Sequence, residues 1–292
     1  MSRLLFVVVS GSLLAAAAGC GASRLDAARA DTAAAAALRE SLTTTSGAEV
    51  AAESGPAGAG WATLKGVFTL DGATPAAKQL VVDKDTEVCS KDGMKLFDRS
   101  LLVDASSKGL ANVVIFVRKA SRVKNAVPTD QLVFDQKNCE FLSPVFAARV
   151  GQPVDVRNSD PVGHNTNIAG TSFNQLIPAG QGTVYTPNKE TGMPVMVTCN
   201  IHPWMKAYAI FRGDGYMAVT AADGSFTIAD LPAGEPLEFQ VWHEQASGPN
   251  GALALDVPAL KWSDKGRFKV TLNADEVRDL GTLVVPASAL GI

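Results

Sequence analysis

The chain has 292 residues, which is enough for one large or two small domains. Its 26 Lys and Arg residues and 29 Asp and Glu residues give a formal net charge of −3. Because the sequence has neither a basic face nor a run of Lys and Arg, we expect no nucleic-acid partner.

The N-terminus has the order of a secretory signal. Arg3 precedes an apolar run over residues 4–14, small residues follow, and Cys20 comes next. The run is short for a bilayer span, which needs about 20 apolar residues. The Ala-Ala-Gly-Cys sequence resembles a bacterial lipobox, although Ala17 stands where that motif usually has Leu. The resemblance implies a lipoprotein signal peptide over residues 1–20 with Cys20 as the lipidation site; the alternative is ordinary cleavage and a soluble secreted protein. We expect an exported, periplasmic or cell-surface protein held to a membrane through Cys20.

Residues 21–60 contain no aromatic residue and are dominated by Ala, Ser, Thr, Gly and Glu. Residues 31–42 could form a helix, because Ala is the best helix former, but they lack an apolar face to bury. We interpret this Ala-rich stretch as a tether.

From Trp61 onward the sequence predicts strands. Short apolar or alternating runs recur at 63–70, 111–118, 131–135, 145–150, 153–157, 195–199 and 207–212. Turn residues separate them, as at Asp71-Gly72 and Gly151-Gln152-Pro153. Many short strands at this spacing favour an all-β fold of sandwiches.

The last region also predicts strands, at 217–220, 225–228 and 237–242, with a hairpin turn at Asp223-Gly224 and a second turn at residues 231–234. Residues 218–234 resemble transthyretin-like or carboxypeptidase-regulatory-like β-sandwiches, and residues 66–72 resemble the opening strand of that family. The segments 61–128 and 214–292 could therefore form one sandwich with residues 129–213 inserted between them, or two separate modules.

Four residues in the middle of the chain are candidate metal ligands. Cys199, His202 and Met205 fall within seven residues, on a loop between two predicted strands, and His164 follows a separate turn. Alternation along the strands turns Cys199 and Met205 toward one core. Two imidazoles, one thiolate and a weak thioether are the ligand set of a type 1 (blue) copper site, so we expect one copper ion. Zinc is a poorer candidate, because its sites do not use a thioether.

The pattern Cys-x-x-His-x-x-Met, with Pro203 after the histidine and Trp204 before the methionine, resembles the ligand loop of amicyanin, a cupredoxin. His164-Asn165 matches the upstream ligand of that family and its neighbour. The run before His164 is also similar to cupredoxins, at Phe141, Pro144, Val150-Gly151, Val154 and Asn158. The likeness covers about residues 130–212 and implies a Greek-key cupredoxin domain at 129–213 beside a transthyretin-like sandwich. The whole arrangement resembles exported cupredoxin-domain proteins, some of them labelled methylamine utilisation proteins.

Two cysteines remain once Cys20 is assigned to a lipid and Cys199 to the metal. Cys89 and Cys139 most simply form a disulfide in an exported protein, and two buried free thiols are the alternative. Asn165 is expected to join the two ligand segments by hydrogen bonds, and Trp204 to cover the site. We interpret His243 as a surface histidine.

The sequence therefore predicts an electron carrier and not an enzyme. A multicopper oxidase needs many more histidines than the three present, and a copper store would need Met-rich or His-rich tracts. An exported copper-binding or scaffold protein without a carrier role is the remaining alternative. For a carrier, the outer edge of the His202 ring is expected at the surface, where a redox partner would dock near His202 and Trp204.

Overall fold

The computed structural model describes residues 60–292. The predicted signal peptide, Cys20 and nearly all of the predicted tether lie outside the described residues. Within residues 60–292, no helix is both long and apolar enough to span a membrane.

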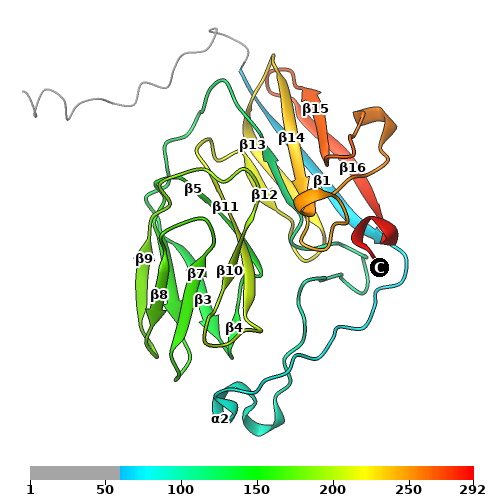
Figure 1. Ribbon diagram of the computed structural model, residues 1–292. Coiled ribbons are helices and arrows are strands. Elements are labelled where there is room, and N and C mark those ends of the chain that lie inside the picture. The colour runs from blue at the N-terminus through cyan, green and yellow to red at the C-terminus, as the bar shows by residue number, and fades with distance from the viewer. Residues whose placement is uncertain (1–59) are drawn as a thin grey trace, which may run out of the picture. The chain divides into compact units, whose positions relative to one another are not determined.

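Nearly all regular secondary structure of the described chain is β-strand, and the strands form four sheets (Figure 1). A three-stranded sheet has the order β13 (Ser225–Pro232), β1 (Trp61–Asp71), β16 (Val277–Pro286). A four-stranded sheet has the order β12 (Met217–Val219), β2 (Val114–Val117), β14 (Pro236–Trp242), β15 (Arg267–Thr271). A five-stranded sheet has the order β5 (Val145–Arg149), β11 (Lys206–Arg212), β10 (Val195–Thr198), β7 (His164–Ile168), β8 (Asn174–Ile177). A second four-stranded sheet has the order β4 (Glu140–Phe141), β3 (Leu132–Lys137), β6 (Val154–Asn158), β9 (Gly182–Tyr185). The all-β prediction is confirmed.

Helical structure within residues 60–292 is limited to short pieces. These are α2 (Thr86–Cys89) and the 3₁₀ turns η1 (Lys91–Gly93), η2 (Pro249–Gly251), η3 (Pro258–Leu260) and η4 (Ala287–Leu290).

The first two sheets enclose one apolar core and make a discontinuous sandwich. Strand β1 pairs with β13 and β16, and β2 pairs with β12 and β14, so strands from both ends of the described chain share these sheets. Phe68, Ile115, Phe239 and Leu283 are among the buried side chains of this core. Of the two arrangements left open by the sequence, the structure has the single sandwich, with β3 to β11 inserted between β2 and β12.

The inserted strands form the second sandwich. Its core takes Phe134 and Val156 from the β4-β3-β6-β9 sheet and Val197 and Phe211 from the five-stranded sheet. Cys199 and Met205 belong to the same core, so both lie on the inner side of the five-stranded sheet, as strand alternation predicted.

A third, smaller cluster joins the two sandwiches. Val114 and Phe116 of β2 contact Val145 and Ile210 of the second sandwich together with Trp242. Since the other face of β2 lies in the first core, all four residues of β2 are buried. Strands buried on both faces have continuous apolar sequences rather than alternating ones.

The turn at Asp223-Gly224 forms, but it is not the predicted hairpin. Strand β12 pairs with β2 and strand β13 with β1, so the turn passes between the two sheets of the first sandwich. Gly224 has φ +79 and its carbonyl accepts a hydrogen bond from Phe68 N–H at 2.9 Å. A Cβ at this position would collide with the Phe68 carbonyl, so both the backbone angle and the close approach require glycine.

Residues 78–98, here called the cap, depart from the predicted domain division. Leu80 N–H bonds the Leu96 carbonyl at 2.9 Å and Asp98 N–H bonds the Lys78 carbonyl at 2.8 Å, which closes the base of this loop. The loop contains α2 and η1. Although it belongs to the predicted N-terminal β segment 61–128, its Leu96 and Cys89 are buried in the core of the second sandwich.

Candidate metal centre

The candidate ligands meet at one end of the five-stranded sheet. His164 is the first residue of β7, and Cys199 directly follows β10, which pairs with β7 through Val197 and Ile168. Residues 199–205 then form the loop that leads into β11, the other neighbour of β10. Adjacent strands in this order bring both ligand segments to one point.

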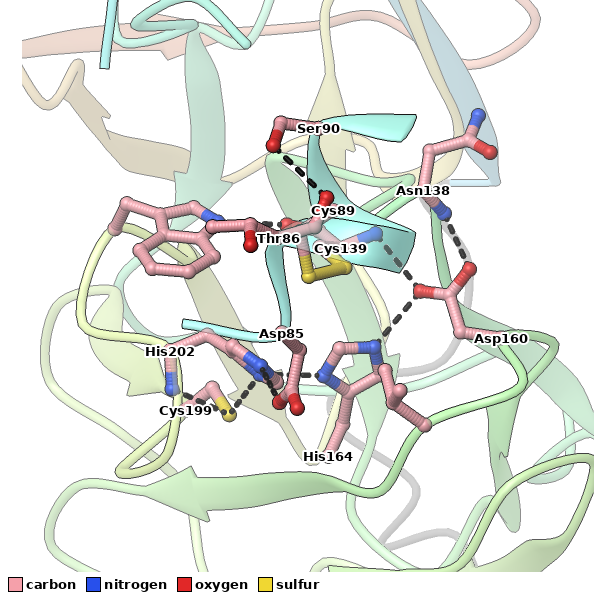
Figure 2. The surroundings of a disulfide bond; sticks show 12 residues. Asp85, Thr86, Cys89, Ser90, Asn138, Cys139, Asp160, His164, Cys199 and His202 are labelled. Atoms are coloured by element: carbon pink, nitrogen blue, oxygen red, sulfur yellow. Dashed lines mark hydrogen bonds and ion pairs between the residues drawn. A yellow bond between two sulfur atoms is a disulfide. The ribbon is translucent and has the colours of Figure 1, made fainter. Parts of the chain in front are cut away.

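Three of the donor atoms lie close together. His164 Nδ1 and His202 Nδ1 face each other at 2.9 Å, and Cys199 Sγ lies 3.8 Å from His202 Nδ1. All three ligand atoms lie within 4.8 Å of one another, and each of the three residues is buried (Figure 2). Contact between two Nδ1 atoms requires that one of them carries a proton, and a metal ion held between the two nitrogens would replace that proton.

The environment of Cys199 favours the thiolate. The sulfur accepts hydrogen bonds from the backbone N–H groups of Asn165 at 3.3 Å and His202 at 3.4 Å. Burial raises the pKa of the thiol, but the contact with His164 and these backbone donors outweigh it and lower the pKa to about 6. The lowered pKa favours the thiolate, which is the metal-binding form of cysteine.

A buried carboxylate contacts the His164 ring at the nitrogen that faces away from His202. His164 Nε2 lies 2.7 Å from Asp160 Oδ2. Burial lowers the pKa of His164, but Asp160 and the Cys199 sulfur more than offset this and raise it to about 8. These contacts favour the protonated form of His164 beside the Cys199 sulfur.

Met205 lies at the end of the ligand loop. Its backbone N–H bonds the His202 carbonyl at 2.9 Å, and its carbonyl accepts the Cys199 N–H at 3.3 Å. The side chain is buried in the core of the second sandwich. These bonds close the loop over seven residues and keep Cys199, His202 and Met205 in one tight turn.

Asn165 joins the two ligand segments, since its Oδ1 accepts the Asn200 N–H at 3.2 Å. Trp204 packs against His202, with ring centroids 5.1 Å apart, and its Nε1–H donates to the Cys139 carbonyl at 3.0 Å. Cys139 is in turn bonded to Cys89 by a disulfide, the pair expected from the cysteine count.

The expected exposure of His202 is wrong. Its side chain is 0% exposed, and its Nε2 lies 2.8 Å from Asp85 Oδ2. The cap covers the ring edge that was expected at the surface. His243, expected at the surface, is 1% exposed.

Sequence reasoning missed both carboxylates. Asp160 stands four residues before His164, a spacing that could have singled it out. Asp85 lies 117 residues from His202, and nothing in the local sequence marks it. Asp160, His164 and Cys139 also cluster, but the Cys139 sulfur is in the disulfide and both carboxylate oxygens of Asp160 accept backbone N–H groups, so we do not treat this cluster as a second metal site.

The donor set fits a copper ion. One sulfur with a lowered pKa and two facing imidazole nitrogens are buried together, and a buried methionine closes the loop that carries two of them. Soft thiolate and borderline imidazole ligands suit both oxidation states of copper. Outer hydrogen bonds of the kind made by Asp160 and Asp85 fix the ring orientation of metal-binding histidines.

No protein-family model matches the chain, and no curated protein matches it. Among solved structures, amicyanin from Paracoccus versutus shares 22% identity over 34% of this chain and 97% of its own, with a TM-score of 0.26. An amicyanin point mutant in its oxidised state shares 19% identity over 28% of this chain and 82% of its own, with a TM-score of 0.26. The copper-containing nitrite reductase (NirK) of Thermus scotoductus SA-01 shares 18% identity over 33% of this chain and 25% of its own, again with a TM-score of 0.26. At these identities and TM-scores the likenesses indicate nothing about function.

Proposed function

We propose that this chain is an exported electron-transfer protein that holds one type 1 copper ion between His164, Cys199 and His202, with Met205 as a weak fourth ligand. One observation carries the proposal: a buried sulfur and two facing imidazole nitrogens meet within 4.8 Å. Copper in such a set supplies one-electron chemistry by cycling between Cu(I) and Cu(II).

The residues around the ligands support this role. Two backbone N–H groups point at the sulfur, and carboxylates fix both imidazole rings from outside. Because the donors are already gathered and shielded from water, little rearrangement would accompany a change of oxidation state. We propose no enzymatic activity, since only His243 remains among the histidines and it lies outside the site.

Export and a lipid anchor at Cys20 are part of the proposal and depend on the signal-like residues 1–20. Digestion of the purified membrane-extracted protein, followed by mass spectrometry of its N-terminal peptide, tests both. A diacylglyceryl group on Cys20 is the expected result, and an unmodified Cys20 after an intact leader would contradict it.

A redox partner would dock beside Trp204. A cavity of about 240 Å³ opens there, and Phe97, Arg99, Trp204 and Met205 are among the residues that line it. Phe97 is 43% exposed, which adds apolar surface close to the ligand loop. Electron-transfer contacts are small, below about 1,200 Å² in total, so docking would not need an extended surface.

The burial of His202 favours a second candidate, an exported copper-binding protein without a carrier role. A carrier gains from an exposed ligand edge, whereas a protein that only holds copper gains from a covered one. In this case the same four residues bind the ion, and slow electron exchange is the distinguishing property.

Two measurements on the copper-loaded protein test the function. Copper analysis should give one ion per chain. NMR line widths in mixtures of the Cu(I) and Cu(II) forms give the self-exchange rate; fast exchange supports the carrier, and exchange too slow to broaden the lines supports the copper-holding alternative. Failure to bind copper would contradict both.

A further inference from the structure

The carboxylate that contacts His202 comes from outside the sandwich that carries the ligands. Asp85 lies in the cap, immediately before α2, and the Asp85 carbonyl accepts the N–H groups of Val88 at 2.9 Å and Cys89 at 2.8 Å. Its Oδ2 lies 2.8 Å from His202 Nε2 (Figure 2). Among the described residues, the cap therefore supplies the hydrogen-bond partner of that nitrogen.

Asp85 is held in an unusual way for a residue at a helix start. An Asp at this position normally has extended backbone angles and caps the helix with its side chain. Asp85 instead has left-handed angles, φ 45 and ψ 43, and its side chain makes no capping hydrogen bond. Both features cost stability to the helical turn, and the carboxylate that is not used as a cap contacts His202 instead.

A disulfide anchors this arrangement. Cys89, at the end of α2, is bonded to Cys139 of the second sandwich. The backbone of Cys139 then contacts the site twice: its N–H donates to Asp160, which holds His164, and its carbonyl accepts the Trp204 indole N–H. The residues whose carboxylates contact the two ligand histidines are thus both hydrogen-bonded to the Cys89–Cys139 disulfide pair: Asp85 to Cys89 N–H and Asp160 to Cys139 N–H (Figure 2).

We propose that Asp85 is a positioning residue for His202, held in place by the Cys89–Cys139 disulfide. By accepting the Nε2 proton, Asp85 fixes the ring so that Nδ1 keeps a free lone pair aimed at the metal site. The inference rests on the proposed copper site and adds to it a ligand-orienting contact from a separate, covalently tethered segment. Outer contacts of this kind typically change metal affinity by about 10–100-fold.

The test compares Asp85→Ala with two variants. Asp85→Asn keeps an oxygen that can accept the Nε2 proton, and Asp83→Ala removes an exposed carboxylate from the same cap. We expect Asp85→Ala to weaken Cu(II) binding about 10–100-fold, Asp85→Asn to recover most of that loss, and Asp83→Ala to match the wild type. Equal affinity in Asp85→Ala and wild type would overturn the proposal.

A second readout needs no metal. In the metal-free wild-type protein, the Nε2 proton of His202 should give a slowly exchanging, hydrogen-bonded NMR resonance, which Asp85→Ala should lose. If the wild-type protein bound no copper, the proposed function would fail, and this resonance would still decide whether Asp85 positions His202. A resonance that persists in Asp85→Ala would overturn the positioning role.

The disulfide is tested by non-additivity. In a Cys89→Ser/Cys139→Ser background, or in wild-type protein reduced with a phosphine if that variant does not fold, Asp85→Ala should have little further effect on Cu(II) affinity. If Asp85→Ala lowered Cu(II) affinity as much without the disulfide as with it, Asp85 would keep its position without the disulfide, and that part of the proposal would be overturned.

Discussion

His164 and His202 face each other through their Nδ1 atoms at 2.9 Å, and each ring is held at its other nitrogen by a carboxylate. Asp160 holds the first ring and Asp85 the second. The two inner nitrogens are therefore directed at a common point beside the Cys199 sulfur before any ion is bound. A preoriented site of this kind loses little conformational entropy on binding a metal.

Met205 should tune the copper without holding it. A distant thioether contributes little to affinity but influences the balance between Cu(I) and Cu(II), so Met205→Leu should keep a blue copper site and raise the reduction potential. Cyclic voltammetry gives the potential. Met196→Leu, at a 41% exposed position, is the control and should leave the potential unchanged. Loss of copper in Met205→Leu would contradict the weak-ligand role.

A charge beside the ligand loop should slow electron exchange. Ile201 is partly exposed and packs near the copper ligands, so Ile201→Lys places a charge that a docked partner would have to desolvate. We expect slower self-exchange with an unchanged visible spectrum. Val277→Lys, at a 60% exposed position on β16, serves as the control. Unchanged rates in Ile201→Lys would mean that electrons enter at another surface.

Removing the disulfide should destabilise the metal-free protein. The closed loop spans 50 residues, for which the chain-entropy model gives about 4 kcal/mol. Urea unfolding of wild type and Cys89→Ala/Cys139→Ala measures the loss. Equal unfolding midpoints, or alkylation of both cysteines without reductant, would contradict the presence of a stabilising bond.

His243 should make the protein acid-sensitive. Burial lowers its pKa from the ordinary 6.5 to about 4, so between these values the unfolded chain binds a proton that the folded chain does not. Above pH 6.5, where His243 is neutral in both states, it costs the folded protein nothing. As the pH falls toward 4, the free energy of unfolding decreases by up to roughly 3 kcal/mol. Urea unfolding of wild type and His243→Gln across this range isolates the effect, because other groups cancel in the difference. Parallel pH profiles for the two proteins would contradict the assignment.

The sequence predicted the strands with clear alternation or apolar runs and the segments that carry the four candidate ligands. It did not predict β7, because the strand His164–Ile168 is rich in polar residues that serve the site and its hydrogen bonds. It also did not predict β8, β9, β15 or β16, and it placed His202 at the surface. The cap explains the last error: contact between Asp85 and His202 depends on a loop and a disulfide that bridge distant parts of the chain, and no local pattern records such contacts.

The visible spectrum of the Cu(II) protein, with and without the Cys199 sulfur, tests the central claim most directly. A thiolate bound to Cu(II) gives an intense charge-transfer band and narrow copper hyperfine splitting, so the wild-type protein should be blue and Cys199→Ser should lose the band. His164 and His202 remain in that variant, so weak copper binding without colour is compatible with the account. A wild-type protein with only weak absorption, or an intense band that survives Cys199→Ser, would contradict it.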